Sequence, residues 1–350
     1  MLAARAERAA HPSRDSAAGA PLSALVETIG LTKHFALGRG RTVHAVDGVS
    51  LAIAEREVVG LVGESGSGKS TFGRTLVGLH AKTGGEVRFA GQRLPPSYGP
   101  ADFRRQAANM QMIFQDPYSS LNPRMTVGEI IGEGLYLAGG HDRAEIRAAV
   151  TDWLARVGLE PGHAARYPHE FSGGQRQRVG IARALILKPR FVVCDEPISA
   201  LDVSVQAQIV RLLGELKASL GLTLLFIAHD LSMVRYVSDR MAVMYLGSLV
   251  EIGTADDVYF RPKHPYTEIL VGSNPEPNPR IERRRASLVV AGEIPSPVNI
   301  GPGCRFAGRC PKVMDVCRRV TPQLAPLADG GTRRVACHLY TPPGAVSEST

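Results

Sequence analysis

The feature that most constrains the fold is a glycine-rich loop that directly follows an apolar strand. Residues 58–62 read Val-Val-Gly-Leu-Val, and the loop continues with Gly63, Glu64, Ser65, Gly66, Ser67, Gly68, Lys69, Ser70 and Thr71. This order fits the phosphate-loop pattern of Gly, four residues, Gly, Lys and Ser. The glycines let successive backbone N–H groups turn toward phosphate oxygens, and the next helix adds its positive N-terminal end. We predict that Lys69 reaches the β- and γ-phosphates of a nucleotide and that Ser70 ligates Mg²⁺.

Strand-like and helical segments alternate along most of the chain. Strand patterns cover residues 24–62, 84–89, 110–114, 191–195 and 222–228, and helical patterns cover 71–80, 143–157, 175–187, 203–220 and 231–239. Such alternation predicts an α/β fold with a mainly parallel sheet that is covered on both faces. Helical patterns are concentrated from about residue 101 to 175, where we expect an inserted helical lobe.

The chain divides into three parts by composition. Residues 1–22 are rich in Ala and Arg but lack the continuous apolar stretch of a secretory signal, so we expect a disordered leader. Residues 23–258 hold the alternating pattern. Residues 259–350 become rich in Pro and Gly and carry four of the five cysteines, which predicts a separate C-terminal appendage.

Charge and hydropathy argue against a nucleic-acid-binding surface and against a membrane channel. Lys and Arg outnumber Asp and Glu by 41 to 33, a net charge of +8, but the basic residues occur in short runs without a nucleic-acid-binding module. We therefore expect no nucleic-acid partner. No apolar run approaches the ~20 residues that span a bilayer, so the chain cannot itself be a membrane channel.

Two carboxylates, Asp195 and Glu196, end the apolar strand of residues 191–194. Ligands of open α/β sheets bind at the carboxyl ends of the strands, so both side chains are placed at the expected site. Asp195 is our candidate for Mg²⁺, and Glu196 is our candidate for polarising the attacking water. Two acidic residues could also simply open a surface loop, but the phosphate loop favours the catalytic interpretation.

Residues 171–175 distinguish this chain from other phosphate-loop proteins. They read Phe-Ser-Gly-Gly-Gln and resemble the Leu-Ser-Gly-Gly-Gln signature of the ATP-binding-cassette family, with Phe at the first position. The resemblance implies a P-loop NTPase core of the RecA-like type. It also implies that the signature loop caps the γ-phosphate held by a partner subunit, through Ser172, Gly173, Gly174 and Gln175.

Further elements of that family follow in order. Gln115 resembles the glutamine that approaches Mg²⁺ and the attacking water, and His229 resembles the histidine that contacts the γ-phosphate. Residues 199–202 (Ser-Ala-Leu-Asp) resemble the loop through which two subunits communicate. Phe35 is our candidate for stacking on adenine. A lone histidine is more often structural, but His229 closes a strand at the same sheet edge.

Longer stretches resemble the ATPases of oligopeptide and dipeptide permeases, in particular the second of the two paralogous types. The stretches are residues 111–125, 167–170 and 264–267. The resemblance implies an ATP-hydrolysing motor that drives import of peptides, glutathione or nickel chelates. It further implies a paralogous ATPase as heterodimer partner, two transmembrane permease subunits, an extracytoplasmic binding protein, and a position on the cytoplasmic face of the bacterial inner membrane.

Two other functional classes fit parts of the sequence. A soluble cassette ATPase that acts on DNA or ribosomes shares the nucleotide motifs, although such proteins usually carry two cassettes or a coiled-coil insertion. A small-molecule phosphotransferase would not need the loop at 172–175.

The appendage carries four cysteines that suit a metal centre: Cys304, Cys310, Cys317 and Cys337. Disulfides are rare in cytosolic, ATP-using proteins. By count, four thiolates fit a [4Fe–4S] cluster or Zn²⁺ equally. The surrounding residues resemble the tail of the permease ATPases, some of which hold an iron–sulfur cluster. This favours the cluster over zinc, with free thiols as a third alternative, and we expect Cys194 to be a packed core thiol.

Overall fold

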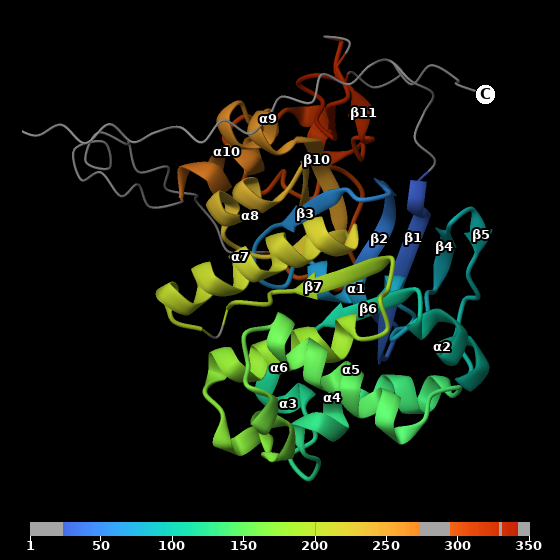
Figure 1. The fold of residues 1–350 in the computed structure, drawn as a ribbon. Coiled ribbons are helices and arrows are strands. Elements are labelled where there is room, and N and C mark those ends of the chain that lie inside the picture. Colours follow the sequence, from blue (N-terminus) through green and yellow to red (C-terminus); the bar gives the residue numbers. More distant parts are fainter. Residues whose placement is uncertain (1–23, 200, 274–294, 329–330, 342–350) are drawn as a thin grey trace, which may run out of the picture.

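The computed structural model describes residues 24–199, 201–273, 295–328 and 331–341, which form two β-sheets with surrounding helices (Figure 1). The leader expected at 1–22 lies outside the described residues, as do residues 274–294, 329–330 and 342–350 of the expected appendage. None of the helices in the described part is both long and apolar enough to span a membrane.

The main sheet has eight strands in the order β11-β12-β10-β9-β3-β8-β7-β6. Their bounds are Val58–Val62 (β3), Met110–Ile113 (β6), Phe191–Asp195 (β7), Thr223–Ile227 (β8), Arg240–Tyr245 (β9), Ser248–Thr254 (β10), Ala325–Pro326 (β11) and Arg334–Val335 (β12). The five strands from β9 to β6 run parallel, as predicted, and the other three add antiparallel. The carboxyl ends of β3, β7 and β8 therefore meet at one edge.

The second sheet has four antiparallel strands in the order β2-β1-β4-β5. They are β1 (Ala24–Gly38), β2 (Arg41–Ala54), β4 (Gly84–Phe89) and β5 (Gln92–Arg93). Arg39 and Gly40 join β1 to β2 with φ of 53° and 71°, a two-residue turn of the kind that closes antiparallel hairpins. So short a turn cannot connect parallel strands, so the strand patterns of residues 24–54 pair antiparallel, and they join β4 and β5 in a sheet separate from the main one.

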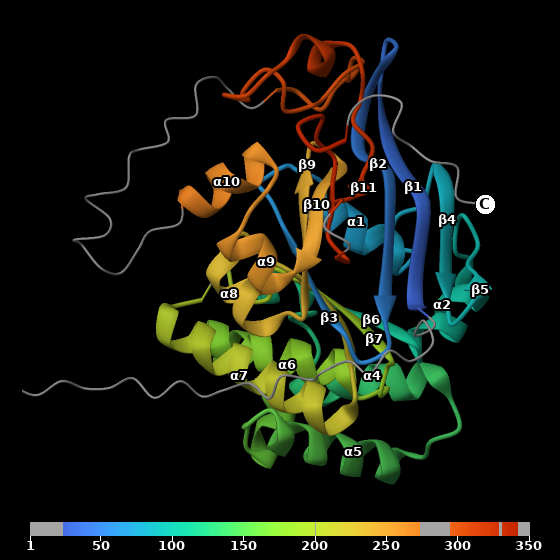
Figure 2. The same ribbon diagram turned by 90° about the horizontal axis from the view of Figure 1, so that it is seen from above.

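The second sheet and the helix after the glycine loop cover one face of the main sheet, and most of the other helices cover the opposite face. The bounds of the helices are Lys69–Leu76 (α1), Pro100–Ala107 (α2), Pro117–Ser120 (α3), Val127–Ala138 (α4), Arg143–Arg156 (α5), Gly173–Leu185 (α6), Val203–Leu220 (α7), Leu231–Val237 (α8), Ala255–Phe260 (α9) and Pro265–Gly272 (α10), with 3₁₀ turns at Pro161–Ala165, Pro168–Glu170 and Asp315–Arg318. Figure 2 shows α1 between the two sheets. Its Phe72 and Leu76 belong to one apolar cluster with residues of both sheets.

The helical lobe consists of α3 to α5 and the start of α6, drawn in green in Figure 1. The range 101–175 that we expected to form this lobe also contains β6, whose Met110–Ile113 pair with β7 in the main sheet. The lobe therefore emerges from an edge strand of the main sheet and returns through α6.

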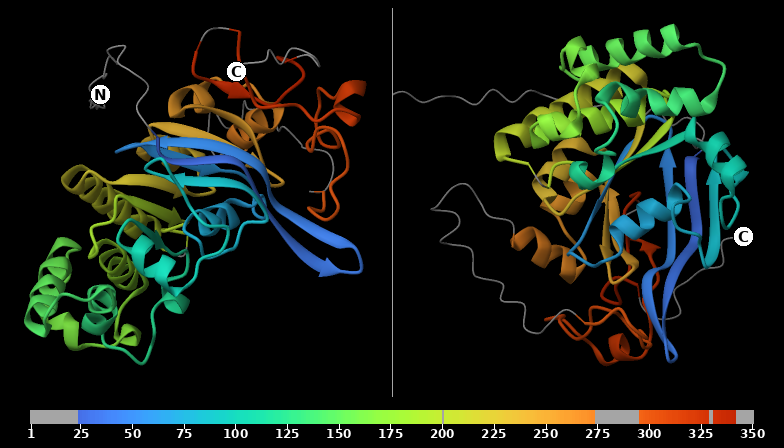
Figure 3. Two further views of the ribbon diagram at one scale, coloured as in Figure 1. Left: turned by 90° about the vertical axis from the view of Figure 1, so that its right-hand side faces the viewer. Right: turned by 90° about the horizontal axis from the view of Figure 1, so that it is seen from below.

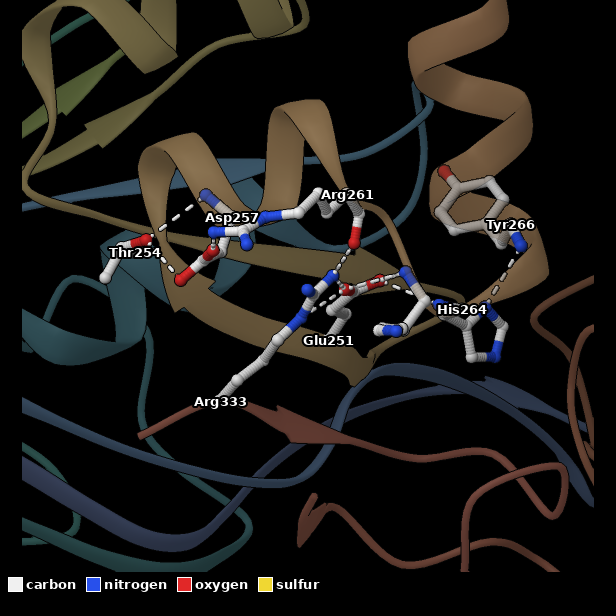
Figure 4. A network of polar contacts seen from close by, with 8 residues as sticks. Glu251, Thr254, Asp257, Arg261, His264, Tyr266 and Arg333 are labelled. Atoms are coloured by element: carbon white, nitrogen blue, oxygen red, sulfur yellow. Dashed lines mark hydrogen bonds and ion pairs between the residues drawn. The ribbon is translucent and has the colours of Figure 1, made fainter. Parts of the chain in front are cut away.

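A buried ion pair fastens the C-terminal segment to the main sheet (Figure 4). The side chain of Glu251 on β10 is 0% exposed and that of Arg333 is 8% exposed. Arg333 Nε donates to Glu251 Oε1 at 3.0 Å, and Arg333 Nη2 donates to the same oxygen and to the carbonyl of Arg261. The backbone N–H groups of Lys263 and His264 donate to the carboxylate at 3.0 and 2.9 Å. The carboxylate is thus fully hydrogen-bonded in the interior.

Candidate nucleotide site

The glycine loop lies at the carboxyl end of β3 and leads into α1 (Lys69–Leu76), which begins two residues earlier and ends four residues earlier than predicted. Gly68 has φ of 102°, and a Cβ atom there would lie 1.9 Å from the carbonyl oxygen of Ala45. Only glycine fits this position without moving the β2 backbone. The loop therefore packs closely against the hairpin strand β2 as well as turning into α1.

Lys69 is buried within the loop. Its Nζ donates to the carbonyls of Gly63 and Glu64 at 2.7 and 2.9 Å. Burial lowers the pKa of Lys69, while the carboxylates of Glu196, Asp195 and Glu64 act in the opposite direction. The ammonium group thus faces the two carboxylates that we assigned to the site from the sequence.

Ser70 and Asp195 meet as predicted from the two separate motifs. Ser70 Oγ donates to Asp195 Oδ1 at 2.6 Å. Asp195 is 0% exposed, and its Oδ2 has no hydrogen-bond partner among the described residues; Arg74 Nη2 lies 3.6 Å from that oxygen. Burial raises the pKa of Asp195. A buried carboxylate oxygen without a donor, next to a serine hydroxyl, is the oxygen-rich environment that Mg²⁺ prefers, so these residues fit the ion.

Glu196 stands at the centre of the remaining catalytic candidates. Its φ of 44° is unusual for a residue other than glycine and turns the chain sharply after β7. Gln115 Nε2 donates to Glu196 Oε2 at 2.8 Å, and His229 Nδ1 lies 3.9 Å from the same oxygen. The structure therefore brings Gln115, Glu196 and His229 together from three different strand ends.

A cavity of about 520 Å³ joins these groups. Its lining comprises Phe35, Val43, Ala45, Ser65, Gly66, Gly68, Lys69, Ser70, Thr71, Gln115, Glu196, His229 and Pro297. Phe35, the adenine-stacking candidate, thus shares the cavity with the phosphate loop. Pro297 comes from the C-terminal segment, and our sequence analysis did not identify it.

The signature loop lies elsewhere. Ser172 caps α6: its Oγ accepts from Gln175 N at 3.3 Å, and Gln175 Oε1 accepts from Ser172 N at 3.0 Å. Ser172 is exposed, and the described lining of the nucleotide cavity contains none of residues 172–175. This placement leaves the helix N-terminus open to a ligand held by another chain.

Four contacts in and around the site join residues that are far apart in the sequence. Arg309 Nη1 and Nη2 donate to the Glu64 carboxylate at 2.9 and 3.1 Å, and the Tyr266 hydroxyl accepts from Glu64 N at 2.8 Å. Arg305 donates to Asp47 and to the carbonyl of Leu246. More than 200 residues separate Glu64 from Tyr266 and Arg309, so no local sequence signal could have revealed these contacts.

The four appendage cysteines line one cavity, together with residues that include Phe306 and His338. All four are free thiols. Burial raises the pKa of Cys337 to about 11, and the other three thiols add to the shift. The fifth cysteine, Cys194, is fully buried in β7, which agrees with a packed core thiol.

Among the described residues, one group of three His, Cys, Asp or Glu side chains has its potential metal-ligating atoms all within 4.8 Å of one another. This group does not include the cysteines. It consists of His34, His44 and Asp47 on the β1–β2 hairpin. His34 Nε2 lies 3.0 Å from Asp47, but Arg305 also occupies Asp47 Oδ2. Although burial acts to raise the pKa of Asp47, Arg305 and the two histidines together lower it. This cluster is satisfied as an ion-pair network.

Two known families match separate stretches of the chain. Residues 46–199 match the family described as ABC transporter, and residues 250–317 match the family described as oligopeptide/dipeptide transporter, C-terminal region. YkfD of Bacillus subtilis (strain 168) is 53% identical over 319 residues, which cover 90% of this chain and 95% of that protein. The oligopeptide transport ATP-binding protein OppF of Escherichia coli (strain K12) is 49% identical over 309 residues, 86% of this chain and 92% of that protein.

A solved structure supports the same assignment. The dimeric ATP-binding cassette MJ0796, bound to ADP and Pi, superposes with a TM-score of 0.61 at 29% identity and covers 66% of this chain and 98% of its own. The fold and the site define an ATP-binding-cassette ATPase, an enzyme that hydrolyses ATP. Within that class, the chain belongs to the oligopeptide/dipeptide transporter family of ATP-binding subunits. The P-loop α/β fold and the family resemblance are thus confirmed, and the relatives give no support to a soluble ATPase that acts on DNA or ribosomes.

Proposed function

We propose that this chain is the motor subunit of an importer for peptides or related solutes. The observation that carries the proposal is that one chain combines the phosphate loop and the catalytic side chains of a nucleotide site with a match to the oligopeptide/dipeptide transporter C-terminal region. We also retain the division into a nucleotide-binding domain (23–258) and a C-terminal extension (259–350).

The chemistry follows from the geometry of the site. Lys69 would exchange the loop carbonyls for β- and γ-phosphate oxygens, and the loop N–H groups would hold the remaining oxygens. Ser70 and Asp195 would hold Mg²⁺, which supplies positive charge to the transferred phosphoryl group. Glu196 would take a proton from the attacking water, held in orientation by Gln115, while His229 would contact the γ-phosphate.

A second nucleotide domain would complete the site. Ser172 to Gln175 lie outside the chain's own nucleotide cavity, and the N–H groups at the start of α6 suit the γ-phosphate of a facing subunit. We propose a paralogous ATPase as that partner, because the family resemblance is to one of two paralogous types. ATP would then close the heterodimer and hydrolysis would open it.

A groove between the core and the helical lobe suits a permease subunit. It is lined by residues that include Phe103, Phe114, Glu133, Leu137 and Arg183, of which Phe103 is 39% exposed and Leu137 61% exposed. The next residue after Phe114 is Gln115, which contacts Glu196. A permease segment in this groove would therefore adjoin the catalytic carboxylate. We place the complex, with its two permeases and extracytoplasmic binding protein, at the inner membrane, with this chain on the cytoplasmic face.

We propose that the cysteine cavity holds a [4Fe–4S] cluster. By count, four thiolates suit such a cluster or Zn²⁺ equally. The four cysteines line one cavity, and the surrounding residues resemble the tail of the permease ATPases, some of which hold an iron–sulfur cluster, which favours the cluster. Bound, such a cluster would cross-link the extension or carry an electron.

The cluster proposal is tested by anaerobic purification. We expect brown protein with about four irons per chain, loss of iron in Cys337→Ser, and retention of iron in Cys194→Ala, the matched control outside the cavity. Colourless protein that contains zinc or reacts as free thiols would decide against the cluster.

The motor proposal is tested with Glu196→Gln and, as a control, Glu215→Gln on the exposed face of α7. We expect Glu196→Gln to retain ATP binding, to lower turnover in the assembled complex by roughly 100-fold or more, and to accumulate the closed dimer on size-exclusion chromatography. Glu215→Gln should behave as wild type. Wild-type turnover in Glu196→Gln would remove this residue from its catalytic role.

A further inference from the structure

A short segment of the C-terminal extension lies along the free edge of β2. His44 N donates to the carbonyl of Pro297 at 2.9 Å, and Asn299 N donates to the carbonyl of Thr42 at 3.0 Å. Val43 and Val298 form a β-bridge, and Thr42 N donates to Asn299 Oδ1 at 3.0 Å. Figure 3 shows this part of the chain, drawn in red, beside the projecting β1–β2 hairpin. The extension thus adds a third strand-like segment to the hairpin.

This pairing brings Pro297 into the nucleotide cavity. The lining of the cavity combines the phosphate loop and the catalytic side chains with an apolar group. Phe35, Val43 and Pro297 lie together in this group, because Phe35 is the direct cross-strand partner of Val43 and Val43 forms a β-bridge with Val298, the residue after Pro297. With the phosphates at Lys69, this apolar group is the part of the lining that suits the base of a bound nucleotide. The pyrrolidine ring is the apolar surface that Pro297 offers there.

We propose that Pro297 contacts the base of bound ATP, so that the C-terminal extension forms one wall of the base-binding subsite. This inference rests on the proposed nucleotide-driven function and deepens it. The chain's own extension, in addition to the aromatic ring of Phe35, then determines how tightly the base is held. Pro297 is a base-contacting residue and takes no part in the chemistry at the γ-phosphate.

Two arginines hold the extension in this place. Arg305 donates to Asp47 and to the carbonyl of Leu246, and its side chain is 12% exposed. Arg309, 8% exposed, binds the Glu64 carboxylate through two nitrogens. Such two-pronged arginine–carboxylate pairs hold a defined geometry. Pro297 is therefore positioned before the nucleotide arrives, which lowers the ordering cost of binding.

The test compares ATP with a ligand that lacks the base. Binding of ATP and of inorganic tripolyphosphate to the full-length chain is measured by calorimetry, with EDTA present to prevent hydrolysis. For Pro297→Ala we expect ATP to bind about 3- to 10-fold more weakly, since apolar contact with the base is lost, and tripolyphosphate to bind unchanged. Pro295→Ala is the matched control, because Pro295 is exposed and two residues upstream; both ligands should bind to it as to wild type.

Each possible result of this experiment either supports or overturns the inference about Pro297. Unchanged ATP affinity in Pro297→Ala overturns the inference, and so does an equal loss for both ligands, which would indicate damage to the phosphate loop. Hydrogen exchange at the His44 amide shows whether the segment remains docked, and a selective loss of ATP affinity with that amide protected is the result we expect. A wild-type chain that binds no ATP even when Mg²⁺ is supplied would instead refute the proposed function itself.

Discussion

Removing the guanidinium of Arg333 should destabilise the protein strongly, because it leaves the Glu251 carboxylate charged in the interior. Glu251 is 0% exposed, and Arg333 is its only cationic partner among the described residues (Figure 4). In Arg333→Met the carboxylate would keep only the backbone N–H groups of Lys263 and His264. Breaking a buried pair by removing one partner costs about 3–5 kcal/mol.

The measurement is urea unfolding of the full-length chain, with the free energy of unfolding obtained by linear extrapolation. Arg333→Met should lower that free energy by about 3–5 kcal/mol. The double variant Glu251→Gln/Arg333→Met removes the stranded charge and should recover at least ~1 kcal/mol of the loss, since contacting residues are energetically coupled. Arg319→Met, in the same segment outside this network, should be near neutral.

The reasoning would be refuted by a loss below ~1 kcal/mol in Arg333→Met, which is the range of a surface pair. It would equally be refuted if the double variant were no more stable than the single one, because the penalty would then come from lost packing and not from the unpaired charge.

Three further perturbations test separate parts of the structure. Ser172→Arg should block hydrolysis at the partner's site while this chain still binds nucleotide; normal turnover of the complex would contradict the shared site. Arg309→Met should weaken both ATP and tripolyphosphate, because the unpaired Glu64 carboxylate would repel phosphate, and it should weaken ATP more, because the extension that carries Pro297 loses one of its two arginine anchors; Glu64→Gln should restore tripolyphosphate binding in calorimetry. Burial lowers the pKa of His264 to about 3. Between that value and the histidine pKa of ~6.5 in the unfolded chain, this side chain is protonated in the unfolded state and neutral in the folded state. The free energy of unfolding should therefore not depend on His264 above pH ~6.5. Below that pH, His264 should lower it by up to ~1.4 kcal/mol for each pH unit. His264→Asn, which keeps a cap for α10, should flatten that slope in urea unfolding between pH 7.5 and 5.5; parallel curves would exclude His264 as the source.

Patterns carried by neighbouring residues predicted much of the fold. The strand Phe191–Asp195 and the helix Val203–Leu220 have the bounds that their apolar patterns indicated. The start of α1 was predicted two residues late, because the backbone becomes helical at Lys69 while the glycine pattern still continues. The spacing of motif residues and the period of the apolar residues are local properties, so both can be obtained from the amino-acid sequence alone.

Pairings between distant segments were not available in this way. β6 pairs with β7 although it lies within a range of helical patterns, and the strands before residue 58 join β4 and β5 in a second sheet. The sheet and the neighbouring strands that a strand joins depend on the packing of many side chains at once. No local sequence pattern predicts that combined effect.

The sequence by itself therefore determined the phosphate loop, the carboxylate pair and the signature loop, because in each of them the chemistry resides in consecutive residues whose backbone geometry is local. Only the tertiary structure decided that Pro297 lies in the same cavity as Phe35 and that Arg309 binds Glu64. These contacts join segments more than 200 residues apart, so they exist only once the sheets have packed and the extension has docked on them.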